Sequence, residues 1–322
     1  MTMKSRYFVF ILICFTCATA YTAYAAEPVK HRLLLNDESR FQLLYVDEIE
    51  PGNSWVIKAG EKIGGGNCVR DLQLIGNHRV LTATPVTGGF REYDLATRTI
   101  VREVTNTPRY INSMTAVRMP DGRTVLGCNQ EHVRLFVLDA EGRETNVLDF
   151  PEFKVIRLMR RTSRDTFLFG TNSDHVVEVD LKGNVLRDIQ IPGAKHVYQV
   201  IELANGNWLC ATGYGGFLAE VDRDGKIVKT WGGNPPPEGL LYYFMSQFQV
   251  LKNGNVIVAT WTGHDSNDSY KGQQLVEFDT SGNVVWTWHD PKLAGSIHGV
   301  LVLDDGIDTD KFYDDTKGIL SK

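Results

Sequence analysis

Short stretches of alternating apolar and polar residues recur along the chain, and none keeps the 3.6-residue period of a substantial helix. One β-rich pattern that ends in aspartate occurs six times. Its copies are residues 44–47, 91–94, 136–139, 177–180, 219–222 and 276–279. Successive copies end 41 to 57 residues apart, which is the length of a four-stranded propeller blade. The pattern therefore predicts six blades.

Glycine turns divide each copy in the same order. The turns after the first strand include Asp121-Gly122, Asn205-Gly206 and Asn253-Gly254. Such pairs supply the positive φ angles that a tight hairpin requires. A second glycine turn follows each of the later aspartates, and one more strand then ends the unit, as expected for short antiparallel strands.

The two ends of the repeat complement each other. The first copy starts near residues 33–35 without an opening strand, and a spare apolar segment, 300–303, follows the sixth copy. Pairing these segments would remove exposed sheet edges. We therefore expect an all-β, six-bladed β-propeller over residues 26–304, with four-stranded antiparallel blades and the C-terminal strand completing the first blade. The charged residues 305–322 form a tail that we expect on the outside.

The N-terminus has the features of a signal peptide. Lys4 and Arg6 precede a short apolar run, 7–16, and cleavage is expected after Ala25 in the Ala23-Tyr24-Ala25 site. The run is shorter than the roughly 20 residues of a membrane span. We therefore predict a periplasmic or extracellular protein without a membrane span. A lipoprotein modified at Cys17 stays open, but the small residue expected before a lipidated cysteine is missing.

Composition excludes several functions. The net charge is −5 with no basic run, so we expect no nucleic-acid partner, and we expect a monomer. Phosphate-loop, EF-hand, G-x-S-x-G and H-E-x-x-H motifs are absent from the sequence. Beyond the signal peptide, Cys68, Cys128 and Cys210 lack metal-ligand spacing, and we predict buried thiols and no metal site.

Polar residues recur where the first strand of each predicted blade begins, which should place them around the central channel. These residues are Asp71, Thr115, Arg157, Gln199, Gln247 and His298. Neighbouring loops add Asn112, Lys154, His196, Tyr198, Tyr242, Trp261 and His264. Because loops on a rigid scaffold carry function, we expect one pocket there.

The residue types suggest the ligand. Arg157 and Lys154 can bind a carboxylate, and Trp261 offers an aromatic face. We predict a pocket for a polar glycan or small molecule, with a uronic-acid-containing ligand as the candidate. If the protein is an enzyme, a polysaccharide lyase or hydrolase is expected. His298 or His196 would be the acid/base with Tyr198 as partner, and Arg157 would neutralise a uronate or stabilise developing negative charge. The alternative is a non-catalytic cell-envelope scaffold whose polar ring only satisfies strand ends.

The blade segments 203–209 and 276–286 resemble those of the PQQ-like and arylsulfotransferase-like propeller superfamily, and residues 247–300 are similar to uncharacterised secreted bacterial propellers. The resemblance implies a sulfotransferase, with His298 or His196 compared to its channel nucleophile, or a quinone-dependent oxidoreductase. The quinone enzymes have eight blades and adjacent cysteines, which this chain lacks. We therefore predict no cofactor, with PQQ or a metal ion left open.

Overall fold

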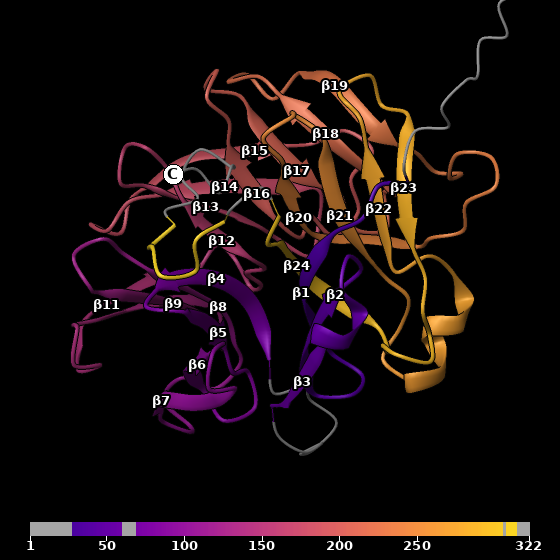
Figure 1. The fold of residues 1–322 in the computed structure, drawn as a ribbon. Coiled ribbons are helices and arrows are strands. Elements are labelled where there is room, and N and C mark those ends of the chain that lie inside the picture. The colour runs from indigo at the N-terminus through magenta and orange to yellow at the C-terminus, as the bar shows by residue number, and fades with distance from the viewer. Residues whose placement is uncertain (1–27, 60–68, 305–306, 314–322) are drawn as a thin grey trace, which may run out of the picture.

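The computed structural model describes residues 28–59, 69–304 and 307–313. The predicted signal peptide, Cys68 and much of the tail lie outside these ranges. The described strands form six four-stranded antiparallel sheets around a central axis, which confirms the predicted six-bladed β-propeller (Figure 1).

The strands are β1 (Arg32–Asp37), β2 (Gln42–Asp47), β3 (Trp55–Lys58), β4 (Arg70–Gly76), β5 (Arg79–Ala83), β6 (Gly89–Asp94), β7 (Thr99–Thr105), β8 (Ser113–Arg118), β9 (Thr124–Asn129), β10 (Val133–Leu138), β11 (Glu144–Phe150), β12 (Met159–Arg161), β13 (Phe167–Gly170), β14 (His175–Val179), β15 (Val185–Gln190), β16 (Val200–Glu202), β17 (Trp208–Ala211), β18 (Phe217–Val221), β19 (Ile227–Gly232), β20 (Phe244–Val250), β21 (Val256–Trp261), β22 (Leu275–Phe278), β23 (Val284–Trp288) and β24 (Ile297–Val302). Two short 3₁₀ helices, η1 (Pro51–Asn53) and η2 (Ser266–Lys271), lie in loops.

The ring closes at blade 1, whose sheet has the order β24-β1-β2-β3. The other blades are β4–β7, β8–β11, β12–β15, β16–β19 and β20–β23, and we number them 2 to 6. Leu33 pairs with Val302 and Leu35 with Val300, so the last strand completes the first blade as predicted. Figure 1 shows the indigo β1 beside the yellow β24 near the centre.

Burial changes from the axis outward. All residues of the innermost strands β20 and β24 are buried, because both faces pack against neighbouring blades. The outermost strand β23 alternates between half-buried and exposed residues until its last position. The inner strand ends are therefore the positions from which polar side chains reach the channel.

The aspartates that end the repeats hold the turns after them. Asp279 Oδ1, for example, accepts hydrogen bonds from the backbone nitrogens of Ser281 and Asn283, both at 2.8 Å. Asp180 and Asp222 make the same contacts in their blades. These aspartates are structural, as Asx turns require.

Part of the predicted tail packs on the propeller. Tyr313 is buried, and Phe312 forms an isolated antiparallel bridge with Ile75 of blade 2. Ile307 and Tyr313 pack into a core cluster that blades 1 and 2 share, so this segment lies against the propeller. Cys128 and Cys210 are buried free thiols, and burial raises the pKa of both. No described helix is long and apolar enough to cross a membrane.

Candidate functional site

A polar layer crosses the channel between blades 2 and 4. Arg160 makes two hydrogen bonds to Asp71, at 2.6 and 3.0 Å, and both side chains are buried. Thr115 also donates to Asp71, at 2.6 Å. Gln199 and Gln247 bond the backbone of Phe248 and Leu72 respectively. These contacts tie the blades together.

A cavity of about 80 Å³, here called the cup, lies next to this layer on the side where the inner strands begin. The residues that line the cup are Arg70, Arg157, His196, Tyr198, Tyr214, Phe244, Trp261, His264 and His298. They come from β4, β20, β21 and β24 and from the loops before β12 and β16 and after β17 and β21. The propeller ring thereby gathers residues that are far apart in sequence.

Glu38 organises one wall of the cup. This buried carboxylate lies in the turn between β1 and β2 and accepts a hydrogen bond from Trp261 Nε1 at 2.7 Å. It also contacts His298 Nε2 at 2.5 Å, His264 Nδ1 at 3.1 Å and Arg70 Nη2 at 3.3 Å. Burial alone would raise the pKa of Glu38, but His298 and Arg70 hold it well below its usual range.

His298 is held between two aromatic rings. Tyr198 and Trp261 stack on it with centroid distances of 5.2 Å each, and Arg70 Nη1 lies 3.0 Å from its Nε2. Burial lowers the pKa of His298 to about 4, although Glu38 acts in the opposite direction. The imidazole is therefore neutral at neutral pH. Its Nδ1 is buried and has no hydrogen-bond partner among the described residues.

His196 also lines the cup. Its backbone has a φ of 74°, and its ring packs edge-on against Phe244 and Tyr214. Burial, and then the positive charge of Arg157, lower the pKa of His196 to about 3. The Nε2 atom is buried and unpartnered within the described part of the chain. This residue is therefore a neutral imidazole that can accept a hydrogen bond.

Arg157 is bonded to other described residues through its backbone and its Nε atom, but not through its terminal nitrogens. Its Nε donates to Asn172 Oδ1 at 2.7 Å, and its backbone nitrogen donates to Gly170 O at 2.9 Å. Burial and the charge of Arg70 lower the pKa of Arg157 to about 10, so the guanidinium stays charged at neutral pH. No described residue accepts a hydrogen bond from its terminal nitrogens. With Arg70 also charged and Glu38 ionised, the cup carries an excess positive charge.

Six of the residues predicted for one pocket line this cup. They are Arg157, His196, Tyr198, Trp261, His264 and His298. Asp71, Gln199 and Gln247 lie in the polar layer instead. Tyr242 is buried with its hydroxyl against Gly233, Lys154 lies in a separate hollow, and Asn112 is in a loop whose backbone bonds Pro85 and Asn129.

Sequence reasoning missed Arg70, Glu38, Tyr214 and Phe244. Glu38 and Tyr214 belong to loops between the second and third strands of their blades. Arg70 directly precedes Asp71, which has a φ of 64°. The left-handed backbone at Asp71 interrupts the regular strand geometry. Asp71 therefore lies in the polar layer, whereas Arg70 lines the cup.

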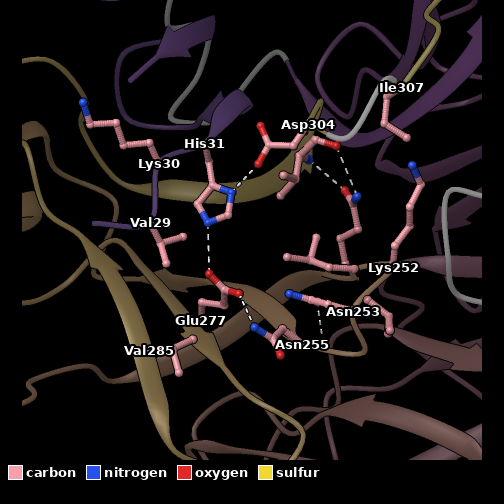
Figure 2. Close-up of a pocket in the computed structure, with 14 residues that line it drawn as sticks. Val29, Lys30, His31, Lys252, Asn253, Asn255, Glu277, Val285, Asp304 and Ile307 are labelled. Carbon is pink, nitrogen blue, oxygen red and sulfur yellow. Dashed lines mark hydrogen bonds and ion pairs between the residues drawn. The ribbon is translucent and has the colours of Figure 1, made fainter. Parts of the chain in front are cut away.

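A larger hollow, of about 490 Å³, lies at the junction of blades 1 and 6 (Figure 2). His31 there contacts Asp304 and, at 2.9 Å, Glu277, whose other oxygen accepts from Asn255 at 2.6 Å. These polar groups satisfy one another. Their arrangement indicates a structural junction, in contrast to the cup with its unpartnered nitrogens. No group of His, Cys, Asp and Glu suited to a metal ion occurs among the described residues.

Comparison with solved structures supports the fold. A protein of unknown function from Bacteroides caccae has a TM-score of 0.69 and 18% identity over 86% of this chain and 100% of its own. A streptogramin B lyase has a TM-score of 0.58 and 11% identity, covering 81% and 80% of the two chains. A virginiamycin B lyase from Staphylococcus aureus, solved with quinupristin, has a TM-score of 0.57 and 10% identity over 80% and 83%.

No family model matches the sequence, and no curated protein matches it. The resemblance to the PQQ-like and arylsulfotransferase-like superfamily is therefore not confirmed beyond the propeller fold. At these identities, the solved structures establish architecture alone, since one fold hosts many activities.

Proposed function

We propose that the cup binds the carboxylate end of a polar, hydroxyl-bearing acid, with a uronic acid as the representative ligand. The observation that carries this proposal is the set of unpartnered nitrogens in one small cavity. The terminal nitrogens of the half-buried Arg157 border the same cavity as two buried nitrogens, Nε2 of His196 and Nδ1 of His298. Buried polar groups normally have partners, so these are the groups that a ligand would satisfy.

The three groups differ in what they bind. A guanidinium donates to a carboxylate through charge-assisted hydrogen bonds. The two imidazoles are neutral because the pKa values of His196 and His298 are lowered to about 3 and about 4. The unprotonated nitrogen of a neutral imidazole accepts from a hydroxyl group. A carboxylate with neighbouring hydroxyls satisfies both kinds of group, and Tyr214 at the rim offers an aromatic face to the ring.

Calorimetric titration with D-galacturonate, with D-galactose as the neutral comparison, tests the proposal. We expect galacturonate alone to bind, and Arg157→Gln to weaken it about 10- to 100-fold, the range of a charged hydrogen bond. Arg143→Gln is the matched control, because Arg143 is exposed and pairs with Asp139 on a turn away from the cup. Absence of galacturonate binding, or equal effects of both variants, would reject the proposal and favour the interaction scaffold.

A second candidate function is elimination at the carbon next to the bound carboxylate. It is suggested by the unpartnered Nε2 of His196, which lines the same cup as Arg157. His196 Nε2 would take the proton α to the carboxylate, and the C–H electron pair would form a C=C bond as the β C–O bond breaks. The departing oxygen would take the proton of Tyr198, whose pKa burial raises. Arg157 would stabilise the charge that develops on the carboxylate.

Incubation with oligogalacturonides, followed by ultraviolet absorbance of the unsaturated product, tests this chemistry. We expect product with the wild type and none with His196→Ala, while galacturonate binding is retained within a few fold because Arg157 is unchanged. If the wild-type protein binds galacturonate but forms no product, the elimination is rejected and the protein is a binding protein. Product formation that survives His196→Ala would reject His196 as the base.

A further inference from the structure

A second hollow, of about 370 Å³, lies next to the cup and is formed by two loops of blade 4. Its lining residues are Glu152, Phe153, Lys154, Val155, Thr171, Asn172, Ser173 and His175. One loop precedes β12 and the other joins β13 to β14. We call this the blade 4 hollow.

The turn after β13 is a wall shared by the blade 4 hollow and the cup. Asn172 Oδ1 accepts the hydrogen bond from Arg157 Nε at 2.7 Å. The next carbonyl, that of Ser173, accepts from the backbone nitrogens of His196 and Val197, both at 2.9 Å. The same turn thus borders the hollow and positions two cup residues. A ligand that leaves the cup past Arg157 reaches Asn172, on the wall of the hollow.

The loop on the other side of the hollow is anchored at several points. Phe153 O accepts from the backbone nitrogen of Val133 at 2.8 Å, and the Phe153 ring packs edge-on against Phe169. The backbone nitrogen of Ile156 donates to Asn129 Oδ1 at 2.7 Å. The hollow is therefore preformed by bonds to blade 3, which reduces the entropic cost of binding there.

The sizes of the two cavities point to a ligand larger than one functional group. The cup measures about 80 Å³, well below the roughly 300 Å³ at which pockets for whole small molecules begin. It can take a carboxylate and the atoms next to it, and the rest of the ligand must lie outside. The blade 4 hollow, at about 370 Å³, lies within the range of pockets for small molecules.

The chemistry of the blade 4 hollow suits an acidic sugar unit. Lys154 is exposed there, and no described residue accepts a hydrogen bond from its ammonium group. Thr171 and Ser173 supply hydroxyls, and Glu152 is a carboxylate that also borders the hollow. We infer that the blade 4 hollow is a second subsite, which makes the ligand an acidic oligosaccharide. This inference rests on the proposed function: the cup takes a terminal uronate, and Lys154 pairs with the carboxylate of the next unit.

Calorimetric titration of wild type with galacturonate and with trigalacturonate tests the second subsite. We expect the trimer to bind several-fold more tightly than the monomer, which is the gain that one exposed charge pair allows. Lys154→Glu should remove most of that difference and leave monomer affinity unchanged. Lys182→Glu is the control with the same charge change, because Lys182 lies on the β14–β15 turn, at the opposite end of the blade.

The outcomes separate the two proposals. Monomer binding without any gain for the trimer would reject the second subsite and leave the proposed function intact. A loss of monomer affinity in Lys154→Glu would assign Lys154 to the cup and also reject the subsite. Failure of both sugars to bind would reject the proposed function, and the second subsite with it.

Discussion

Arg70 and Arg157 reach the same cup from blades 2 and 4, and the charge of Arg70 adds to burial in lowering the pKa of Arg157 to about 10. Glu38 contacts Arg70 at 3.3 Å, whereas the terminal nitrogens of Arg157 meet no acceptor among the described residues. Two guanidiniums close together disfavour each other's charge. An anion placed between Arg157 and the histidines would relieve that repulsion, which is why the charge balance of the cup matters for its function.

Changing Glu38 to Gln tests this charge balance. The variant keeps the side-chain shape but leaves Arg70 without its buried carboxylate, and breaking such a pair costs about 3–5 kcal/mol of folding stability. The cup becomes more positive, so we expect galacturonate affinity to rise several-fold. Urea unfolding and calorimetry measure the two effects. Glu144→Gln, which affects a half-exposed pair with Arg109, should cost less than about 1 kcal/mol. A fall in affinity would show that Glu38 itself contacts the ligand.

Two of the three cup histidines, His196 and His298, should stay neutral well into the acidic range. Burial lowers the pKa of His196 to about 3 and that of His298 to about 4, whereas the hydrogen bond to Glu38 raises the pKa of His264. ¹⁵N spectra of the histidine rings should therefore show neutral His196 and His298 from about pH 6 to pH 8, with a charged fraction for His264 near neutrality. Single His→Ala variants assign the signals.

The same shifts set the sign of a stability effect. Below about pH 6.5 the unfolded chain protonates His196 and His298 more readily than the folded protein does, so these groups lower stability as the pH falls. His196→Ala should consequently flatten the acid side of the stability profile. A ring signal of His196 that titrates near pH 6.5, its ordinary pKa, would contradict the proposed burial of this imidazole.

The fold follows from local patterns that the sequence displays directly. Aspartate-ended repeats such as 276–279 carry the turn contacts of Asp279, so each repeat marks one blade regardless of its partners. The pairing of Leu33 with Val302 was also predictable, because one end lacked a strand and the other had one to spare. The number of blades and the closure of the ring depend on how many strands there are and in what order they occur. The spacing of the sequence repeats shows both.

The site was only partly predictable, because it depends on side-chain direction. Residues at or just before the start of inner strands, such as Arg157 and His298, were predictable as channel residues from their place in the repeat. The left-handed backbone at Asp71, by contrast, sends Asp71 and Arg70 into different layers. Glu38 lies in a short turn with no pattern around it, and its contacts with Trp261 and His298 exist only after the ring closes.

The Asp71–Arg160 pair should be strongly coupled, since it is buried and spans two blades. Asp71→Asn and Arg160→Gln should each cost about 3–5 kcal/mol of unfolding free energy, because each breaks a buried ion pair and leaves the remaining charge less well compensated. The double variant removes both charges, so its cost should be well below the sum of the two. Urea unfolding of the four proteins measures the coupling. Asp149→Asn, in a half-exposed pair with Arg134, is the control, and strict additivity at Asp71 and Arg160 would contradict the prediction.

His31 should make the closure of the ring sensitive to alkaline pH. It directly precedes β1 and contacts Glu277 of blade 6 and Asp304 just beyond β24, so it links both closing strands to the neighbouring blade (Figure 2). Burial alone would lower the pKa of His31, but hydrogen bonds to Asp304 and Glu277 raise it to about 9. Because the folded-state pKa exceeds the unfolded value of 6.5, the stabilisation is complete below about pH 6.5 and is lost as the pH rises through about 9.

Unfolding free energies of the wild type and His31→Gln measure this contribution. We expect the wild type to exceed the variant by up to about 3 kcal/mol more at pH 6 than at pH 10, since each unit of pKa shift corresponds to about 1.4 kcal/mol. Taking the difference between the two proteins cancels the titration of other groups. His132→Gln, which affects a pair with the half-exposed Asp149, should show a much smaller change. A wild-type advantage that is equal at both pH values would mean that His31 acts through packing and that its charge does not hold the closing strands to blade 6.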